Sequence, residues 1–242
     1  IFMLNSFFYE IKKNLQKKFK NLTHFFFFLL YGKITKVVKY TDSKDIQTAS
    51  VEKDNIFYKI FTVSNGRFYT DNVGDAAVII KNQIVEGPSY QFRSDPNNSL
   101  SPRNNSNASL NIVFEKGTPR FKKKVIGSVF SLLSGGGANN NYFHWLYDVL
   151  PRFALLEKFQ NSIKPDYILV PNYQLDYQKS TLNLLGFKSK QIISSKFYRH
   201  FDYSKIFITD HPYNITNDTL VDHEKIPAWI SKWLKGKFLK NN

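Results

Sequence analysis

Residues 125–158 read VIGSVFSLLSGGGANNNYFHWLYDVLPRFALLEK, and this stretch decides the fold. Residues 125–133 have the apolar pattern of a buried strand, and the glycines at 135–137 predict a turn. Residues 139–158 predict a helix that is interrupted at Pro151, because proline lacks a backbone N–H and clashes with the preceding turn. A strand, a turn and a helix in this order are typical of an α/β fold.

The alternation of strands and helices continues downstream of this unit. Gly186 is placed to end a helix, and Pro227 is placed near the start of another. The remaining predicted elements are strands at 167–170, 192–193 and 206–209 and helices at 175–185 and from Pro227 to about 239. This alternation predicts a mainly parallel sheet that is covered on both faces, and it assigns residues 121–242 to one α/β lobe.

The segment upstream of the lobe, residues 34–120, is rich in predicted β-strands. A turn at 64–66 and a short connection at 82–83 separate them, and residues 94–109 lack apolar periodicity and predict a loop. The predicted strands are residues 56–63, 67–70, 76–81 and 84–86. We therefore expect a β-rich region before the α/β lobe.

Residues 1–33 form a third region, a basic leader in which residues 4–30 predict an amphipathic helix. One face carries apolar side chains and the other carries lysines; the apolar positions are Leu4, Phe8, Ile11, Leu15, Phe19, Leu22, Phe26 and Leu29. The run at 25–30 is too short to cross a bilayer, and no small-residue cleavage pattern of a signal peptide follows. The helix could lie on a membrane surface, pack on its own domain or be a poorly ordered leader. We expect a cytoplasmic protein that is soluble or peripheral at a membrane.

The amino-acid composition excludes some classes of function for the chain. The chain has 242 residues, 42% hydrophobic and 22% charged, which is typical of a globular protein. The lack of cysteine excludes disulfides, thiolate metal sites and a cysteine nucleophile. The net charge of +15 raises the possibility of a nucleic-acid partner, but no recognition motif accompanies it, and we expect none. A basic nucleic-acid-binding protein or a non-catalytic scaffold on a membrane surface stays as the alternative to an enzyme.

The helix after the glycines carries the candidate chemistry. Asn141, His144, Asp148 and Arg152 are spaced three, four and four residues apart, so they share one helix face. His144 could act as a general base with Asp148 as its partner, or the roles could be reversed. Arg152 could hold the fold of the cleft, an acceptor or a phosphate. The simpler alternative is an ordinary surface pair of His144 and Asp148.

The other histidines indicate no metal site. His24, His200, His211 and His223 lie in different segments without ligand spacing. The pairs 199–200 and 210–211 could lie at the edge of the cleft, but they are more typical of ordinary loops.

The sequence NNYFHWLYDVLPRFALLEK at 140–158 resembles the signature of glycosyltransferase family 61. GRFYTDNVGDAAVI at 66–79, EGPSYQFR at 86–93, PDYILVPN at 165–172 and IPAWISKWLKGKF at 226–238 also resemble its microbial members, which act in capsular and exopolysaccharide synthesis. The similarity covers roughly residues 55–240, and its most specific part is the central motif. The motif positions matched here are His144, Trp145, Asp148, Pro151 and Arg152.

The resemblance implies a GT-B-like glycosyltransferase with a Rossmann-like N-terminal lobe. Such enzymes are usually inverting; they move a sugar from a nucleotide-sugar donor, here expected to be a UDP-sugar, to a glycan hydroxyl, with no cofactor and no required metal. The catalytic candidates are then His144, Asp148 and Arg152. The substrate-binding candidates are Gly135, Gly136, Gly137, Asn141 and Trp145, of which Trp145 could instead be a core residue. We expect the second lobe to lie beyond Asn242, so that the isolated N-terminal part is inactive.

Overall fold

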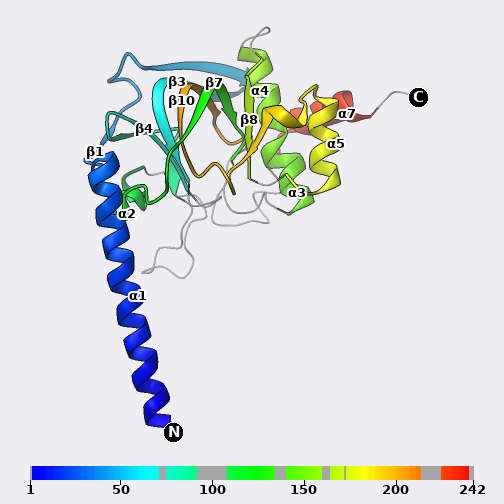
Figure 1. Cartoon of the computed structure of the whole chain (residues 1–242). Helices are drawn as coiled ribbons and strands as arrows, with labels where there is room; N and C mark the ends of the chain where they lie inside the picture. The colour runs from blue at the N-terminus through cyan, green and yellow to red at the C-terminus, as the bar shows by residue number, and fades with distance from the viewer. Residues whose placement is uncertain are drawn as a thin grey trace.

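The fold is that of a computed structural model, which describes residues 2–70, 75–91, 108–133, 140–159, 164–171, 173–213 and 225–239. Figure 1 shows a layered α/β body from which one long helix projects. The described residues form a ten-stranded mixed sheet in the order β1-β5-β4-β3-β10-β7-β8-β9, with β2 and β6 paired beside β3 and β4. The chain is thus a mixed α/β protein whose large sheet is flanked by helices.

The half of the sheet built from the later part of the chain is parallel, as expected. Its strands are β7 (Lys123–Ser131), β8 (Tyr167–Val170), β9 (Ile192–Ser194) and β10 (His200–Thr209). β7 pairs in parallel with β8 on one side and with β10 on the other. β10 is longer than the predicted strand, because its first half pairs with both β7 and β3.

β3 (Ile56–Tyr69) connects the two halves of the sheet and corrects one prediction. The expected turn at 64–66 is wrong, because the strand continues through it. Asn65 adopts a positive φ of 52°, but the residues on both sides of it keep their partners in β10. Long-range pairing therefore overrides the local preference for a turn. Before this bend β3 pairs with β2 (Ile46–Lys53), and after it with β4 (Asp75–Ile80).

The remaining strands make the sheet mixed rather than mainly parallel. β4 and β5 (Gln83–Val85) form the expected hairpin, and Lys81 and Asn82 provide its two positive φ angles. β1 (Lys36–Val38) pairs with β5 in parallel, and β6 (Tyr90–Gln91) pairs with β4. Ala108–Leu110 and α2 (Val113–Lys116) follow as short helical turns. Most of the predicted loop at 94–109 lies outside the described residues.

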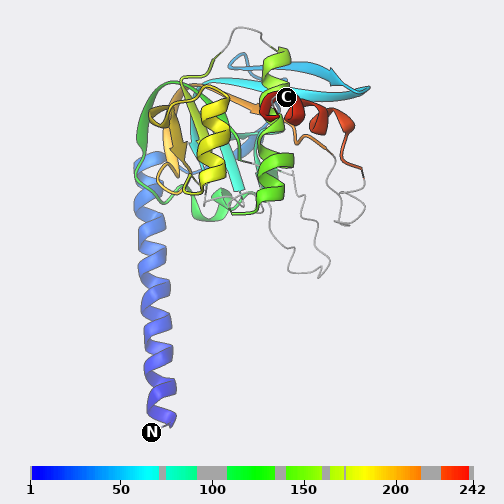
Figure 2. The ribbon, with the colours of Figure 1, turned by 90° about the vertical axis from the view of Figure 1, so that its right-hand side faces the viewer.

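The described helices of the α/β lobe share one face of the sheet. α4 (Pro151–Phe159), α5 (Asp176–Leu184) and α7 (Ala228–Phe238) lie on the same side of the sheet (Figure 2). Their apolar side chains pack into one cluster with those of β7, β8 and β10. The other face is filled by side chains of the curved sheet itself, including Phe68, Val129 and Phe201, and Tyr198 packs against them. The expectation of helices on both faces is therefore wrong for the described part of the chain.

The leader forms α1 (Phe2–Tyr31), a 30-residue helix, as predicted. Only its last turns contact the body, where the ring of Phe27 lies 5.1 Å from that of Phe121. The rest projects away from the domain in both views (Figures 1 and 2). No helix among the described residues is long and apolar enough to cross a membrane.

Candidate functional site

The candidate site is carried by the helical segment that follows β7. It begins with α3 (Tyr142–His144), continues as a π-helical turn over Trp145–Val149 and ends in α4. The side-chain oxygen of Asn141 accepts hydrogen bonds from the backbone N–H groups of Phe143, at 2.9 Å, and His144, at 3.3 Å. Asn141 is therefore the N-cap of the helix, a role that asparagine fills well.

The predicted interruption at Pro151 is confirmed, and its form is the π-helical turn. The N–H of Leu150 donates to the carbonyl of Trp145 at 3.1 Å, five residues back. Pro151 has no N–H to donate, so the helix changes its winding immediately before it. Turns of this kind are frequent at functional sites, and this one contains Asp148.

Asp148 is the centre of a cluster of polar side chains, which we call the Asp148 cluster: His144, Asp148, His211 and Tyr213. His144 Nδ1 lies 2.8 Å from Asp148 Oδ2, and the Tyr213 hydroxyl donates to Asp148 Oδ1 at 2.5 Å. His211 Nε2 lies 3.7 Å from Oδ2, beyond hydrogen-bond distance. The Asp148 carboxylate is buried, whereas the His144 side chain is 27% exposed.

The environment of Asp148 favours its ionised form. Burial alone raises the pKa of this carboxyl, but its interactions with His144, His211 and Tyr213 outweigh burial and hold the pKa well below the usual range. An ionised carboxylate only accepts hydrogen bonds, so Nδ1 of His144 must carry the proton. In neutral His144 the lone pair is then on Nε2, the ring atom that can take a proton.

Arg152 lies beneath this cluster and is buried. Its Nε donates to the carbonyl of Asp148 at 2.9 Å, and its Nη1 donates to the carbonyl of Thr209 at 3.1 Å. Burial lowers the pKa of the Arg152 guanidinium. Of the roles that the sequence left open for Arg152, this geometry fits the first: it fastens the helix to the end of β10.

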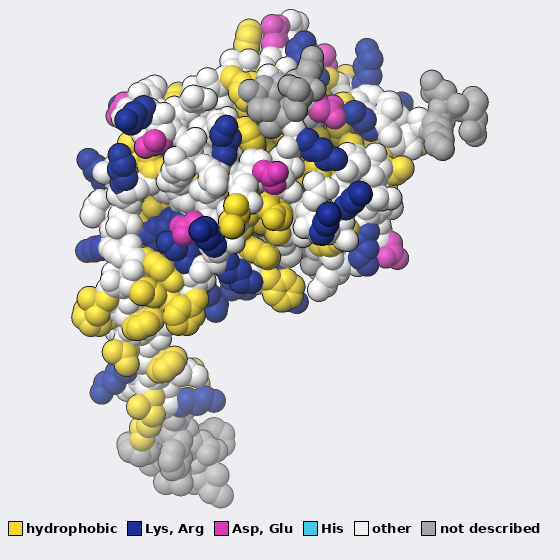
Figure 3. Space-filling model, turned by 45° about the horizontal axis from the view of Figure 1, so that its top comes forward, with side chains coloured by type: hydrophobic (Ala, Val, Ile, Leu, Met, Phe, Trp, Pro, Cys, Tyr) yellow, Lys and Arg dark blue, Asp and Glu magenta, His cyan; other side chains and the backbone are white. Residues whose placement is uncertain are grey.

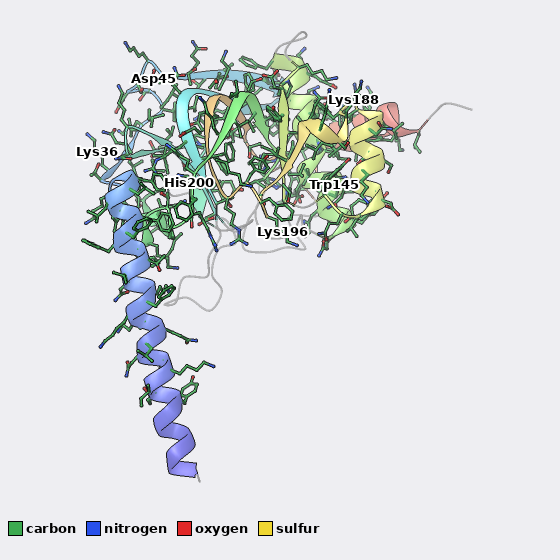
Figure 4. All side chains as sticks on the ribbon, viewed as in Figure 1. Lys36, Asp45, Trp145, Lys188, Lys196 and His200 are labelled. Carbon is green, nitrogen blue, oxygen red and sulfur yellow. The ribbon has the colours of Figure 1, made fainter. Side chains whose placement is uncertain are left out.

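Trp145 lies in the apolar core between the helices (Figure 4). It is fully buried, and its indole N–H donates to Thr181 Oγ1 in α5 at 3.0 Å. The structure thus places it as a core residue rather than as a sugar-stacking surface. Gly135, Gly136 and Gly137 lie outside the described residues.

The Asp148 cluster lies at the carboxyl ends of β7 and β10. From β7 the chain proceeds outward through β8 to β9, whereas β10 returns to the other side of β7. The strand order therefore reverses between β7 and β10, which is where open α/β sheets bind ligands. Asp210, directly after β10, accepts from the Lys59 N–H at 2.7 Å, and burial raises the pKa of its carboxyl.

His211 and Tyr213 complete the site. The sequence left two possibilities open for the pair 210–211, the edge of the cleft or an ordinary loop, and His211 lies beside Asp148. Tyr213, which the sequence did not indicate, donates a hydrogen bond to Asp148 across 65 positions of sequence. The sequence nevertheless contained a signal for this placement. Residues 210–213 directly follow a predicted strand, just as the glycines at 135–137 directly follow the predicted strand 125–133. Because the carboxyl ends of parallel strands meet at one edge of a sheet, the segments that follow these two strands are expected to lie close together.

A second polar cluster lies at the other end of β10, and we call it the Arg67 cluster: Arg67, His200, Thr118 and Asn82. His200 Nδ1 donates to the carbonyl of Arg120 at 2.8 Å, and its Nε2 accepts from Arg67 at 3.2 Å. Arg67 also donates to Thr118 and Asn82, both at 2.8 Å. Burial, reinforced by the nearby charges of Arg67 and Lys122, lowers the pKa of His200 to about 4.

Neither cluster offers a metal site: within the described ranges, no group of three histidine or acidic residues is arranged to hold a metal ion. Comparisons of the chain with protein-family models, with curated proteins and with solved structures gave no match.

Proposed function

We propose that this chain forms a sugar-transferring lobe of an inverting glycosyltransferase of the GT-B type, acting in polysaccharide or glycoconjugate synthesis. The observation that carries the proposal is the hydrogen-bonded set His144–Asp148–Tyr213 at the carboxyl ends of β7 and β10. A partly exposed imidazole is held there by a buried, ionised carboxylate. This is the arrangement expected of a general base.

In the proposed reaction His144 Nε2 removes the proton from an acceptor hydroxyl of a glycan. The hydroxyl oxygen forms a bond to the anomeric carbon of the donor, and the bond from that carbon to the phosphate oxygen breaks. The nucleoside diphosphate leaves from the opposite side, so the configuration inverts. Asp148 orients the imidazole and stabilises its protonated form, while Tyr213 and Arg152 hold Asp148 and its helix in place.

The strand order supports a nucleotide-sugar donor. Numbered along the chain, the four parallel strands lie in the order 3-2-1-4, given by β9-β8-β7-β10. Rossmann-like folds use this order and bind nucleotides where it reverses. The Asp148 cluster lies at that point. The proposed donor is a UDP-sugar, and the proposed chemistry requires neither a cofactor nor a metal.

The test uses the full-length protein that contains this lobe, with a panel of UDP-, GDP-, CMP- and dTDP-sugars. Ligand-observed NMR measures binding, and chromatography measures the nucleotide released with and without short glycan acceptors. We expect one class of donor to bind, and His144→Gln to leave binding nearly unchanged while reducing nucleotide release about 100-fold or more.

His200→Gln is the matched control, because it changes a histidine of the Arg67 cluster, at the far end of β10. It should leave both donor binding and nucleotide release unchanged. A full-length protein that binds no donor of the panel, or a His144→Gln variant that releases nucleotide as fast as the wild type, would overturn the proposal.

A further inference from the structure

α1 exposes a continuous apolar stripe to solvent. The stripe consists of Ile11, Leu15, Phe19, Leu22, Phe26 and Leu29, whose exposed fractions lie between 40% and 73%. Figure 3 shows hydrophobic side chains along the visible side of the helix and at its base. Soluble monomers rarely expose a contiguous apolar surface of this kind unless it binds something.

The body of the protein contacts α1 mainly on the side opposite the stripe, and of the stripe residues Phe26 also approaches it, with its ring 6.3 Å from that of Phe121. Phe27 is buried there, Phe28 contacts Gly117, and the Tyr31 ring lies 4.8 Å from that of His200. Because successive helical residues are rotated by about 100°, positions 27, 28 and 31 face away from positions 22, 26 and 29. Apart from the partly covered Phe26, the stripe therefore points away from the domain.

The charges of α1 indicate what kind of surface the stripe would bind. Lys12 and Lys18 lie along its two edges, and Lys13, Lys17 and Lys20 occupy the polar side, whereas the acidic residues of α1 are limited to Glu10. Two copies of α1 packed stripe to stripe would bring the edge lysines Lys12 and Lys18 of both copies into one interface, which is unfavourable. An anionic surface with an apolar layer beneath it complements both the stripe and its lysines.

We propose that α1 lies flat on an anionic lipid membrane, with the stripe inserted into the boundary between headgroups and acyl chains. The lysines at the edges of the stripe contact anionic headgroups, and the helix of 30 residues, about 45 Å long, holds the domain at the surface. The inference rests on α1 alone and stands or falls independently of the proposed transferase activity.

The test is co-sedimentation of the full chain with vesicles of phosphatidylcholine containing 30% phosphatidylglycerol, compared with pure phosphatidylcholine. We expect binding to the anionic vesicles that weakens with added salt. Leu15→Ser combined with Leu22→Ser should weaken this binding at least tenfold. The matched control, Asn14→Ser with Asn21→Ser, introduces serine at neighbouring exposed positions off the stripe and should bind as the wild type does.

Circular dichroism and the thermal unfolding midpoint should be the same for both double variants, because all four positions are exposed. The proposal is overturned if the wild type does not bind the anionic vesicles, or if both double variants bind equally. It is also overturned if light scattering shows a dimer that only the Leu15→Ser, Leu22→Ser variant loses, since the stripe would then bind a second copy of the chain.

Discussion

The two polar clusters at the ends of β10 place histidine in opposite electrostatic environments. At the amino end His200 lies against the Arg67 guanidinium, and its pKa is lowered to about 4. Past the carboxyl end His144 and His211 lie around the ionised carboxylate of Asp148. His200 is thus a neutral hydrogen-bond relay in the core, whereas His144 has a partner that stabilises its protonated form. Only the second arrangement suits proton transfer near neutral pH.

Among the variants that test this comparison, removal of the Asp148 carboxylate should produce the largest loss in the free energy of unfolding. Asp148→Ala leaves the Tyr213 hydroxyl and His144 Nδ1 without their acceptor, and it removes one of the two carboxylates whose charges act on the buried Arg152. We expect a loss of about 4 kcal/mol in the free energy of unfolding at pH 7, measured by urea titration. Asp176→Ala, at a fully exposed aspartate, is the control and should cost less than about 1 kcal/mol.

The pH dependence of this loss follows from the direction of the pKa shift. Because folding lowers the pKa of Asp148, its stabilisation is present above the ordinary aspartate pKa of about 3.9 and is lost as the pH falls below it. The difference between wild type and Asp148→Ala should therefore shrink between about pH 4 and pH 2. If the difference in the free energy of unfolding stays constant across this range, the ionised carboxylate is not its source.

The effect of His200 on the free energy of unfolding should appear in a different pH range. Folding lowers its pKa from about 6.5 to about 4, so its contribution is fully present above pH 6.5 and is lost as the pH falls toward 4. The wild type should lose up to about 3 kcal/mol more than His200→Gln across this window. Urea unfolding at pH 7, 5.5 and 4.5 measures both slopes, and parallel slopes would contradict the assignment of a neutral His200.

The contribution of the hydrogen bond from Tyr213 to Asp148 can be measured by making the same Tyr→Phe substitution at two buried tyrosines. Tyr213→Phe removes the O–H that donates to the carboxylate and should cost about 2 kcal/mol, because hydrogen bonds to charged groups are the stronger kind. Tyr203→Phe removes a buried hydroxyl that has no hydrogen-bond partner among the described residues, and it should be neutral or slightly stabilising. Equal unfolding midpoints for the two variants would show that the bond contributes nothing.

The N-cap of α3 should give the smallest effect. Asn141→Ala removes the acceptor of two backbone N–H groups and should cost about 1 kcal/mol, whereas Asn141→Asp keeps the cap and should cost little. Thermal unfolding by calorimetry separates the two. If donor binding is lost in Asn141→Asp although its stability is retained, Asn141 contacts the ligand as well as the helix.

The parts of the fold that were predicted correctly depend on local signals. The end of α5 is one example, since Gly186 takes a φ of 83° that other residues rarely adopt. Another is the interruption at Pro151, which follows from the missing N–H of proline alone. The spacing of His144 and Asp148 likewise predicted that they are neighbours, because positions four apart lie on the same side of an α-helix, and the π-helical turn keeps them in contact.

The parts that were missed depend on partners far away in the sequence. β3 continues through residues 64–66 because β10 pairs with both sides of the bend, and that partner is more than 130 positions away. Tyr213 reaches Asp148 only because β10 lies beside β7. The sequence left the role of Trp145 open between the core and a sugar contact, because its burial depends on where α5 packs, which periodicity in its own helix does not show.

The pairing of β3 with β10 has a consequence for how the protein is made. Roughly 130 residues separate the end of β3 from the start of β10, and a ribosome adds about 5–20 residues per second. The backbone groups of β3 that pair with β10 therefore stay unpaired for on the order of 10 s. During this time apolar side chains such as Ile60, Val63 and Phe68 are still uncovered. We therefore expect this strand to bind chaperones during synthesis, and a block in translation before residue 200 should yield an aggregating product.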